Sequence, residues 1–88
     1  MEHTEEWKLY LYLDEQDGQT RATARLHTRD TMLTGVGTAH RHPHDVDIPE
    51  IGDELAAARA LSDLAHKLFG AAVTDIESST HRPAAITL

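Results

Sequence analysis

The sequence predicts an α+β domain in which a three-stranded antiparallel sheet packs on one long C-terminal helix. Residues 7–13 alternate between apolar and polar side chains at period two, which is typical of a half-buried strand. The dipeptide Asp17-Gly18 follows and suits the two central positions of a tight hairpin turn. Residues 49–80 form an alanine-rich segment whose apolar residues fall on one half of a helical wheel.

The register of the first hairpin follows from its turn. If Asp17 and Gly18 occupy the turn, Gln16 pairs with Gln19. The apolar faces of the two strands then coincide, and we expect this shared face, with Trp7, to point toward the core. Counting back along the strands gives three apolar pairs: Leu13 with Ala22, Leu11 with Ala24 and Leu9 with Leu26.

A third strand is expected over residues 32–40, after a polar turn at residues 28–31. Gly35 and Gly37 fall within this strand and share the parity of Leu33 and Ala39. We interpret this parity as the face toward the helix. Small residues there would form a shallow floor for large helix side chains, namely Leu61, Leu68 and Phe69.

The helix is expected over residues 49–80, after a loop at residues 42–48, with Pro49 in its first turn. Such a helix measures roughly 45 Å, against about 27 Å for an eight-residue strand. It should therefore break near Gly70 or project its second half beyond the sheet. With residues 1–6 as a flexible tail, 7–41 as the sheet and 81–88 as a short extended tail, the chain forms a single domain. The predicted apolar stripe of the helix comprises Ile51, Leu55, Ala58, Leu61, Ala65, Leu68, Phe69, Ala72 and Ile76.

Composition narrows the classes of function. With 88 residues the chain is near the lower size at which one hydrophobic core suffices, so we expect a homodimer that buries a further surface. Cysteine is absent, which excludes thiol catalysis and cysteine-ligated metals. No apolar run reaches membrane-spanning length and the N-terminus is acidic, so we expect a cytoplasmic protein without a membrane segment. The net charge of −7 opposes general binding to a phosphate backbone.

Two polar clusters could carry chemistry. Ser62, Asp63 and His66 lie within one helical turn, but such neighbours are expected on any amphipathic helix, so we expect neither catalysis nor a cofactor. The second cluster consists of His40, His42 and His44. Alternate histidines on an extended chain can converge on a divalent metal ion. The alternative is a solvated polar loop, because Pro43 interrupts the alternation. A metal-binding or protein-interaction module using this loop is one hypothesis for the function.

The sheet face away from the helix carries the candidate binding residues. Aromatic rings flanked by cations can stack on RNA bases and neutralise phosphates. The alternative is cross-strand pairing on a face that is solvated or buried in a homodimer. The sequence leaves both interpretations open. The face is expected to present aromatic and basic groups without an acid between them: Lys8, Tyr10, Tyr12, Arg21, Arg25 and His27.

A set of motifs along nearly the whole chain resembles a small actinobacterial family of unknown function. The resemblance implies a β-β-β-α fold like that of double-stranded RNA-binding domains, commonly as a dimer. It also implies a relation to a dormancy-associated mycobacterial protein and to ribosome hibernation factors. The motifs are Trp7 followed by alternation, Asp14-Glu15-x-Asp17-Gly18-x-Thr20-Arg21-Ala22, Gly35-Val36-Gly37-x-Ala39, Ile48-Pro49-Glu50-Ile51-Gly52-Asp53-Glu54-Leu55, Ala58-Arg59-Ala60-Leu61-Ser62-Asp63-Leu64, and Asp75-Ile76-Glu77 through Thr80-His81-x-Pro83-Ala84.

The resemblance makes a non-catalytic, stress-associated protein acting on ribosomes the leading hypothesis. The usual mode of double-stranded RNA binding is not expected, because Glu50, Asp53 and Glu54 at the start of the helix would repel phosphates. The histidines at 40, 42 and 44 depart from the family pattern, so a metal site there would not be a family property.

Overall fold

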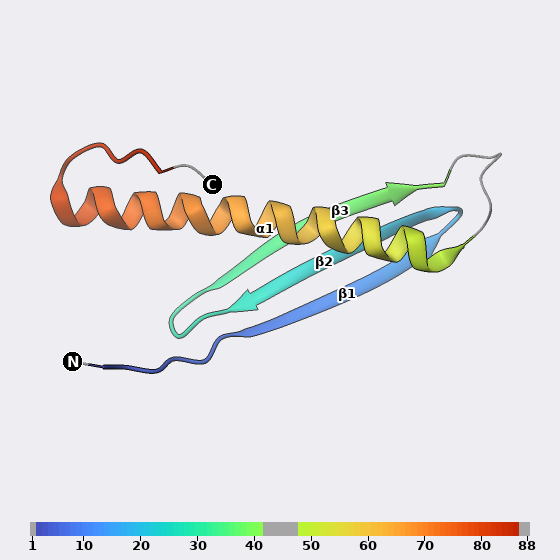
Figure 1. Ribbon diagram of the computed structural model, residues 1–88, viewed down its shortest axis with the longest axis horizontal. Helices are drawn as coiled ribbons and strands as arrows, with labels where there is room; N and C mark the ends of the chain where they lie inside the picture. The colour runs from blue at the N-terminus through green and yellow to red at the C-terminus, as the bar shows by residue number, and fades with distance from the viewer. Residues whose placement is uncertain (1, 42–47, 87–88) are drawn as a thin grey trace.

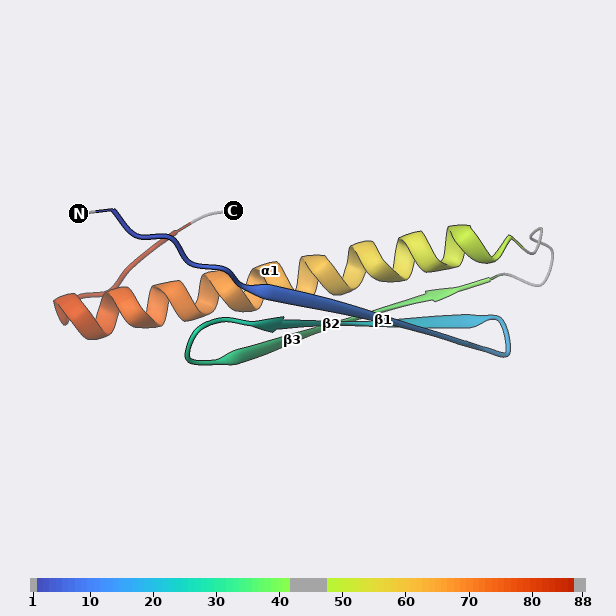
Figure 2. The ribbon, with the colours of Figure 1, turned by 90° about the horizontal axis from the view of Figure 1, so that it is seen from below.

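The computed structural model describes residues 2–41 and 48–86 and confirms the α+β arrangement. Three strands, β1 (Lys8–Gln16), β2 (Gln19–His27) and β3 (Met32–His40), form one antiparallel sheet in the order β1-β2-β3. The helix α1 (Pro49–Thr80) follows and lies across one face of this sheet, as Figures 1 and 2 show from two directions. No helix or strand of the described residues covers the other face of the sheet.

The predicted hairpin between β1 and β2 is confirmed. Asp17 and Gly18 both have positive φ, at 52° and 75°, as a turn of this type requires. The register pairs Gln16 with Gln19 and carries through to the apolar pairs predicted for Leu9, Leu11 and Leu13. The turn sequence Asp17-Gly18 was therefore enough to predict how β1 and β2 pair.

The glycines of β3 face the helix, as their parity predicted. Both are buried, and a Cβ atom at Gly35 would lie 2.6 Å from the backbone nitrogen of Leu64. A Cβ atom at Gly37 would overlap the backbone of α1 at Ala56 and Ala60. The backbones of β3 and α1 thus approach so closely that no side chain fits between them.

The side chains that α1 presents to this floor differ from the prediction. Ala56, Ala60 and Leu64, spaced four residues apart on one face of the helix, are the buried ones. Leu61, predicted to descend onto the floor, is 38% exposed, whereas Leu68 packs at the margin of the core. The reason is steric: beside Gly37 the helix backbone comes so close to the sheet that only the small residues Ala56 and Ala60 fit there, while Leu64 is buried beside Gly35. The predicted apolar stripe is therefore largely outside the contact.

The apolar face of β1 is also uncovered, contrary to the expectation that it would face the core. Trp7, Leu9, Leu11 and Leu13 are all 40–50% exposed. The helix packs mainly on β3 and β2 and makes few contacts with β1. The described residues include no large side chain that is fully buried. The single chain thus has a core made mostly of alanine, with Leu26 and Leu64, beside the exposed leucines of β1.

The helix does not break at Gly70. The second of the two expected outcomes is therefore the observed one, and the second half of the helix projects beyond the sheet. It runs without interruption to Thr80 and extends beyond the sheet, as Figure 1 shows. His81 then adopts a left-handed conformation with φ of 56°, which ends the helix. The following residues turn back, and the N–H of Ala84 donates to Oε2 of Glu77 at 3.0 Å. Over the residues described, no helix is long and apolar enough to cross a membrane.

Candidate functional site

The sheet face opposite α1, called the open face below, brings together the candidate binding residues from β1 and β2. The register places Lys8 opposite His27 and Tyr10 opposite Arg25. The rings of Tyr10 and His27 meet edge to face with centroids 5.5 Å apart. The guanidinium carbon of Arg25 lies 5.6 Å from the centroid of the Tyr12 ring, which is the geometry of a cation–π contact. These contacts order four of the six predicted side chains into one cluster.

Arg25 is half-buried within this cluster. Its Nε lies out of contact with solvent and has no hydrogen-bond partner within the described residues. A buried donor without an acceptor costs free energy, so the contact with Tyr12 must offset part of that cost. No carboxylate within residues 2–41 and 48–86 forms a salt bridge with Arg25. Within the described residues, Arg25 therefore makes a cation–π contact and no salt bridge.

The expectation that this face lacks an acid is wrong at one position. Asp14 lies directly opposite Arg21 in the register of β1 and β2. β1 continues to Gln16, and the alternation of side chains along it places Asp14 on the same face as Tyr12. The three strands together present three cations on this face, Lys8, Arg21 and Arg25, against one carboxylate. The local balance of +2 contrasts with −7 for the whole chain.

The third strand, β3, also contributes to the open face, which was not predicted. The β2–β3 register places Thr38 beside Arg21, Met32 beside His27 and His40 beside Gln19. The sequence contained the information needed to predict this contribution: if Gly35 and Gly37 face the helix, the residues that alternate with them along β3 must face away from it. At the hairpin end of the face lies a shallow polar depression lined by Asp14, Gln16, Asp17, Gln19, Arg21 and His40.

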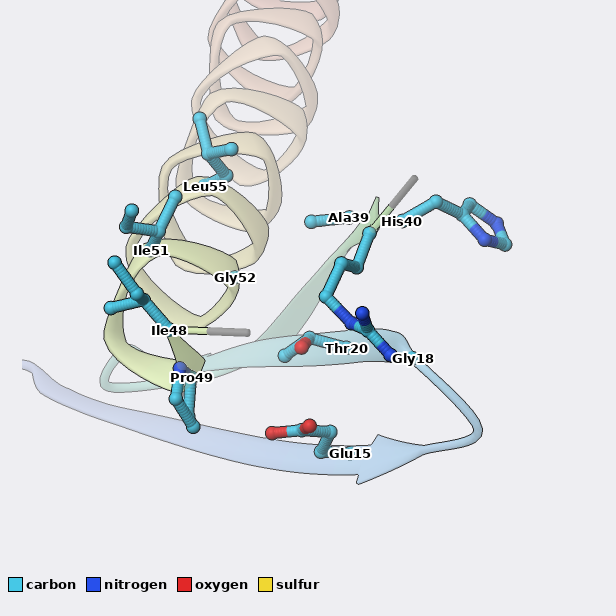
Figure 3. A pocket seen from close by; sticks show the side chains of 11 residues that line it. Glu15, Gly18, Thr20, Ala39, His40, Ile48, Pro49, Ile51, Gly52 and Leu55 are labelled. Carbon is cyan, nitrogen blue, oxygen red and sulfur yellow. The ribbon is translucent and has the colours of Figure 1, made fainter. Parts of the chain in front are cut away.

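A second hollow lies on the helix side, between the β1–β2 turn and the start of α1. Figure 3 shows Ile51 and Leu55 of α1 on one side of it and Glu15 of β1 on the other. Its volume is about 260 Å³, and it is also lined by Thr20, which is only 4% exposed. The carboxylate of Glu15 and the hydroxyl of Thr20 come from neighbouring strands and are not hydrogen-bonded to each other among the residues described. The imidazole of His40 points away from the hollow, as Figure 3 shows, so the hollow offers no assembled acid–base pair.

The other predicted clusters can be placed only in part. His40 ends β3, while His42 and His44 lie outside the described residues, so the metal site of this loop stays a prediction. No group of three metal-ligating side chains is found within residues 2–41 and 48–86. On the helix, Nδ1 of His66 lies 2.8 Å from the carbonyl oxygen of Ser62.

Asp63, the carboxylate of that helical cluster, is engaged with the sheet. Its Oδ2 accepts the backbone N–H of Val36 at 2.9 Å and lies 3.1 Å from Nζ of Lys67. The hydrogen bond from Val36 and the neighbouring ammonium of Lys67 lower the pKa of this carboxyl below its usual value. Asp63 thus joins helix and sheet.

The chain belongs to the Rv2632c-like family, whose model matches residues 5–85. It is 50% identical over 78 residues to the uncharacterized protein Mb1767 of Mycobacterium bovis, covering 89% of this chain and 83% of that protein. It is 52% identical over 71 residues to the uncharacterized protein Rv2632c of Mycobacterium tuberculosis, covering 81% and 76%. The crystal structure of Rv2632c matches with a TM-score of 0.84 at 45% identity, over 93% of this chain and 98% of that one. These matches confirm the small family that the motifs indicated, and its relatives are uncharacterized.

Proposed function

We propose that this member of the Rv2632c-like family is a non-catalytic, stress-associated cytoplasmic protein that binds RNA through the open face, with the ribosome as its target. The observation that supports the proposal is the cluster of Tyr10, Tyr12, Arg25 and His27 on a sheet face that the helix leaves uncovered. Exposed tyrosine rings offer stacking surfaces to unpaired bases, and the adjacent cations offer contacts to phosphates. The family resemblance to hibernation-type proteins supplies the ribosome as the target.

The charges predict how such binding should behave. Only Lys8, Arg21 and Arg25 are fixed cations on the open face, and the rest of the chain is acidic. If all three contact phosphates of a single strand or a duplex, affinity should fall about 20- to 40-fold between about 50 and 200 mM salt. We therefore expect weak binding that is readily lost at moderate salt.

We also propose that the protein works as a homodimer. Support comes from the distribution of apolar residues, because Leu9, Leu11 and Leu13 on β1 and Ile51 and Leu55 on α1 are 40–52% exposed. Exposed apolar patches of this kind mark interaction surfaces in soluble proteins. The apolar side chains of β1 point to the opposite face from Tyr10 and Tyr12, so a second copy can cover them without covering the open face.

The experiment is co-sedimentation with ribosomes from stressed cells at low and moderate salt. We expect the wild type in the ribosomal fraction at low salt, with much less at moderate salt. The variant Arg21→Glu/Arg25→Glu should be absent from that fraction. The matched control is Arg29→Glu/Arg82→Glu, which makes the same change in charge at two exposed arginines that lie off the strands and should sediment as the wild type does. Circular dichroism of each variant verifies that it is folded.

Two results would overturn the proposal. Absence of the wild type from the ribosomal fraction at low salt would exclude the ribosome as target. Equal loss of the Arg29→Glu/Arg82→Glu variant would show that binding follows net charge rather than the open face.

A further inference from the structure

The two edges of the sheet are treated differently by the fold. Along β3, three side chains of α1 reach over the edge and occupy its free backbone groups. Oδ2 of Asp63 accepts the N–H of Val36 at 2.9 Å, Nη1 of Arg59 donates to the carbonyl of Thr38 at 2.8 Å, and Nζ of Lys67 donates to the carbonyl of Thr34 at 2.7 Å. This edge is closed to another strand.

No such cover exists along β1 in the described part of the chain. All nine residues of β1 are exposed, and the strand contains no proline or glycine. Because Gln16 and Gln19 flank a two-residue turn, they form a hydrogen-bonded pair, and every second residue of β1 back from Gln16 bonds to β2. The backbone groups of Leu9, Leu11 and Leu13 therefore point to the free edge. The same alternation makes Thr34, Val36 and Thr38 the outward residues of β3, which agrees with the helix contacts there.

We propose that a second copy of this chain pairs with β1 along this edge, antiparallel, about a two-fold axis through Leu11. This inference rests on the proposed homodimer and gives it a geometry. Leu11 would exchange both backbone hydrogen bonds with the partner subunit's Leu11, and Leu9 would do so with the partner subunit's Leu13. Six backbone hydrogen bonds would join the two sheets into one of six strands.

Charge and side-chain pairing select this register. Centred on Leu11, the pairing places Lys8 opposite the partner subunit's Asp14 and Tyr10 opposite the partner subunit's Tyr12, both favourable cross-strand pairs. A shift of the axis to Tyr12 would place Leu9 opposite the partner subunit's Glu15 and Tyr10 opposite the partner subunit's Asp14. A shift to Tyr10 would place Glu6 opposite the partner subunit's Asp14, which repels.

The pairing has a consequence for the open face. Antiparallel pairing about a residue keeps odd positions opposite odd positions, so the leucines of both copies stay on the helix side and the tyrosines stay on the open side. The two open faces then join into one surface, with the tyrosines meeting at the axis and a combined balance of +4. An extended strand of RNA that crosses the β-strands would meet a surface twice as wide as the one that a single copy provides.

Engineered cysteines test the register, because the chain has none of its own. In the proposed pair, the two Cα atoms at position 11 lie about 5.5 Å apart, within the range that a disulfide spans. Those at position 12 lie about 8 Å apart and those at position 13 about 14 Å apart, beyond that range. Under mild oxidation, Leu11→Cys should form a covalent dimer on a non-reducing gel, while the matched single variants Tyr12→Cys and Leu13→Cys should not. The double variant Lys8→Cys/Asp14→Cys, which keeps Leu11, should also cross-link.

Light scattering of the reduced proteins separates this inference from the homodimer on which it rests. A monomeric wild type at high micromolar concentration would overturn both. A dimeric wild type for which Leu11→Cys and Lys8→Cys/Asp14→Cys stay uncross-linked would overturn the pairing through β1 and leave the homodimer standing. Cross-linking of Tyr12→Cys in place of Leu11→Cys would overturn the axis at Leu11.

Discussion

Replacing Gly37 by alanine adds one methyl group at the place where β3 and α1 lie closest. The new Cβ atom would overlap backbone atoms of Ala56 and Ala60, which cannot rotate away as a side-chain tip could. Gly37 does not have a positive φ, so the backbone itself accepts alanine and the effect is steric. Overpacking costs up to about 3 kcal/mol, and the lower entropy of an unfolded chain with alanine offsets up to about 1 kcal/mol. We expect a net loss of about 2 kcal/mol in the free energy of unfolding.

For a domain of this size, that loss lowers the thermal midpoint by about 8–16 °C. The measurement is thermal unfolding by circular dichroism at one fixed protein concentration, since the midpoint of a dimer depends on concentration. Gly70→Ala is the matched control, because the residue lies in α1 and a Cβ atom there would meet no atom within 4 Å other than those of its own stretch of helix backbone. It should raise stability by about 0.5–1 kcal/mol. An unchanged or higher midpoint for Gly37→Ala would refute the close approach of helix and sheet.

Two further predictions concern the hairpin turn and the helix–sheet hydrogen bond. Gly18→Ala should lower the free energy of unfolding by about 1 kcal/mol in denaturant titrations, because φ is 75° there and the added Cβ atom meets only the Arg41 side chain, at 3.9 Å; no loss would exclude the proposed turn. For Asp63, the folded pKa lies below the unfolded one, so its contribution is present above the unfolded pKa and is lost as pH falls through the folded pKa. The difference in midpoint between wild type and Asp63→Asn should therefore be fully present above the ordinary pKa of an aspartate, about 4, and shrink as the pH falls below it, and a constant difference would contradict this assignment.

The hairpin and the strand parities could be predicted from sequence because their causes are local. A two-residue turn at Asp17 and Gly18 sets the register of nine pairs, and alternation then sets which side chains share a face. The face of Gly35 and Gly37 followed from the same alternation. The pairing of Tyr10 with Arg25 followed as well, so the arrangement of the candidate residues on β1 and β2 could be predicted from the sequence alone.

The contact line of the helix could not be predicted in this way. Apolar periodicity marks where Ile51, Leu55 and Leu61 lie on the wheel, but it does not say which strand of the sheet lies beneath them. The distance between helix and sheet is set by two segments that are far apart in the sequence, because the glycines of β3 pack against the small residues Ala56 and Ala60. The apolar stripe of the helix favours contact through the large residues, whereas the distance between backbones favours contact through the small ones. In this fold the backbone distance decides.

One physical cause connects this close packing with the exposed leucines. Because α1 sits deep on β3, its polar side chains Arg59, Asp63 and Lys67 can reach around and occupy the β3 edge. The same position places the helix away from β1, so that the leucines and the backbone groups of that strand lack cover in the described chain. A fold that closes one edge of its sheet with its own helix thus leaves the other edge and its apolar face to a second molecule. Shifting the helix toward β1 would cover the leucines, but it would free the edge of β3 and move Ala60 off the glycine floor.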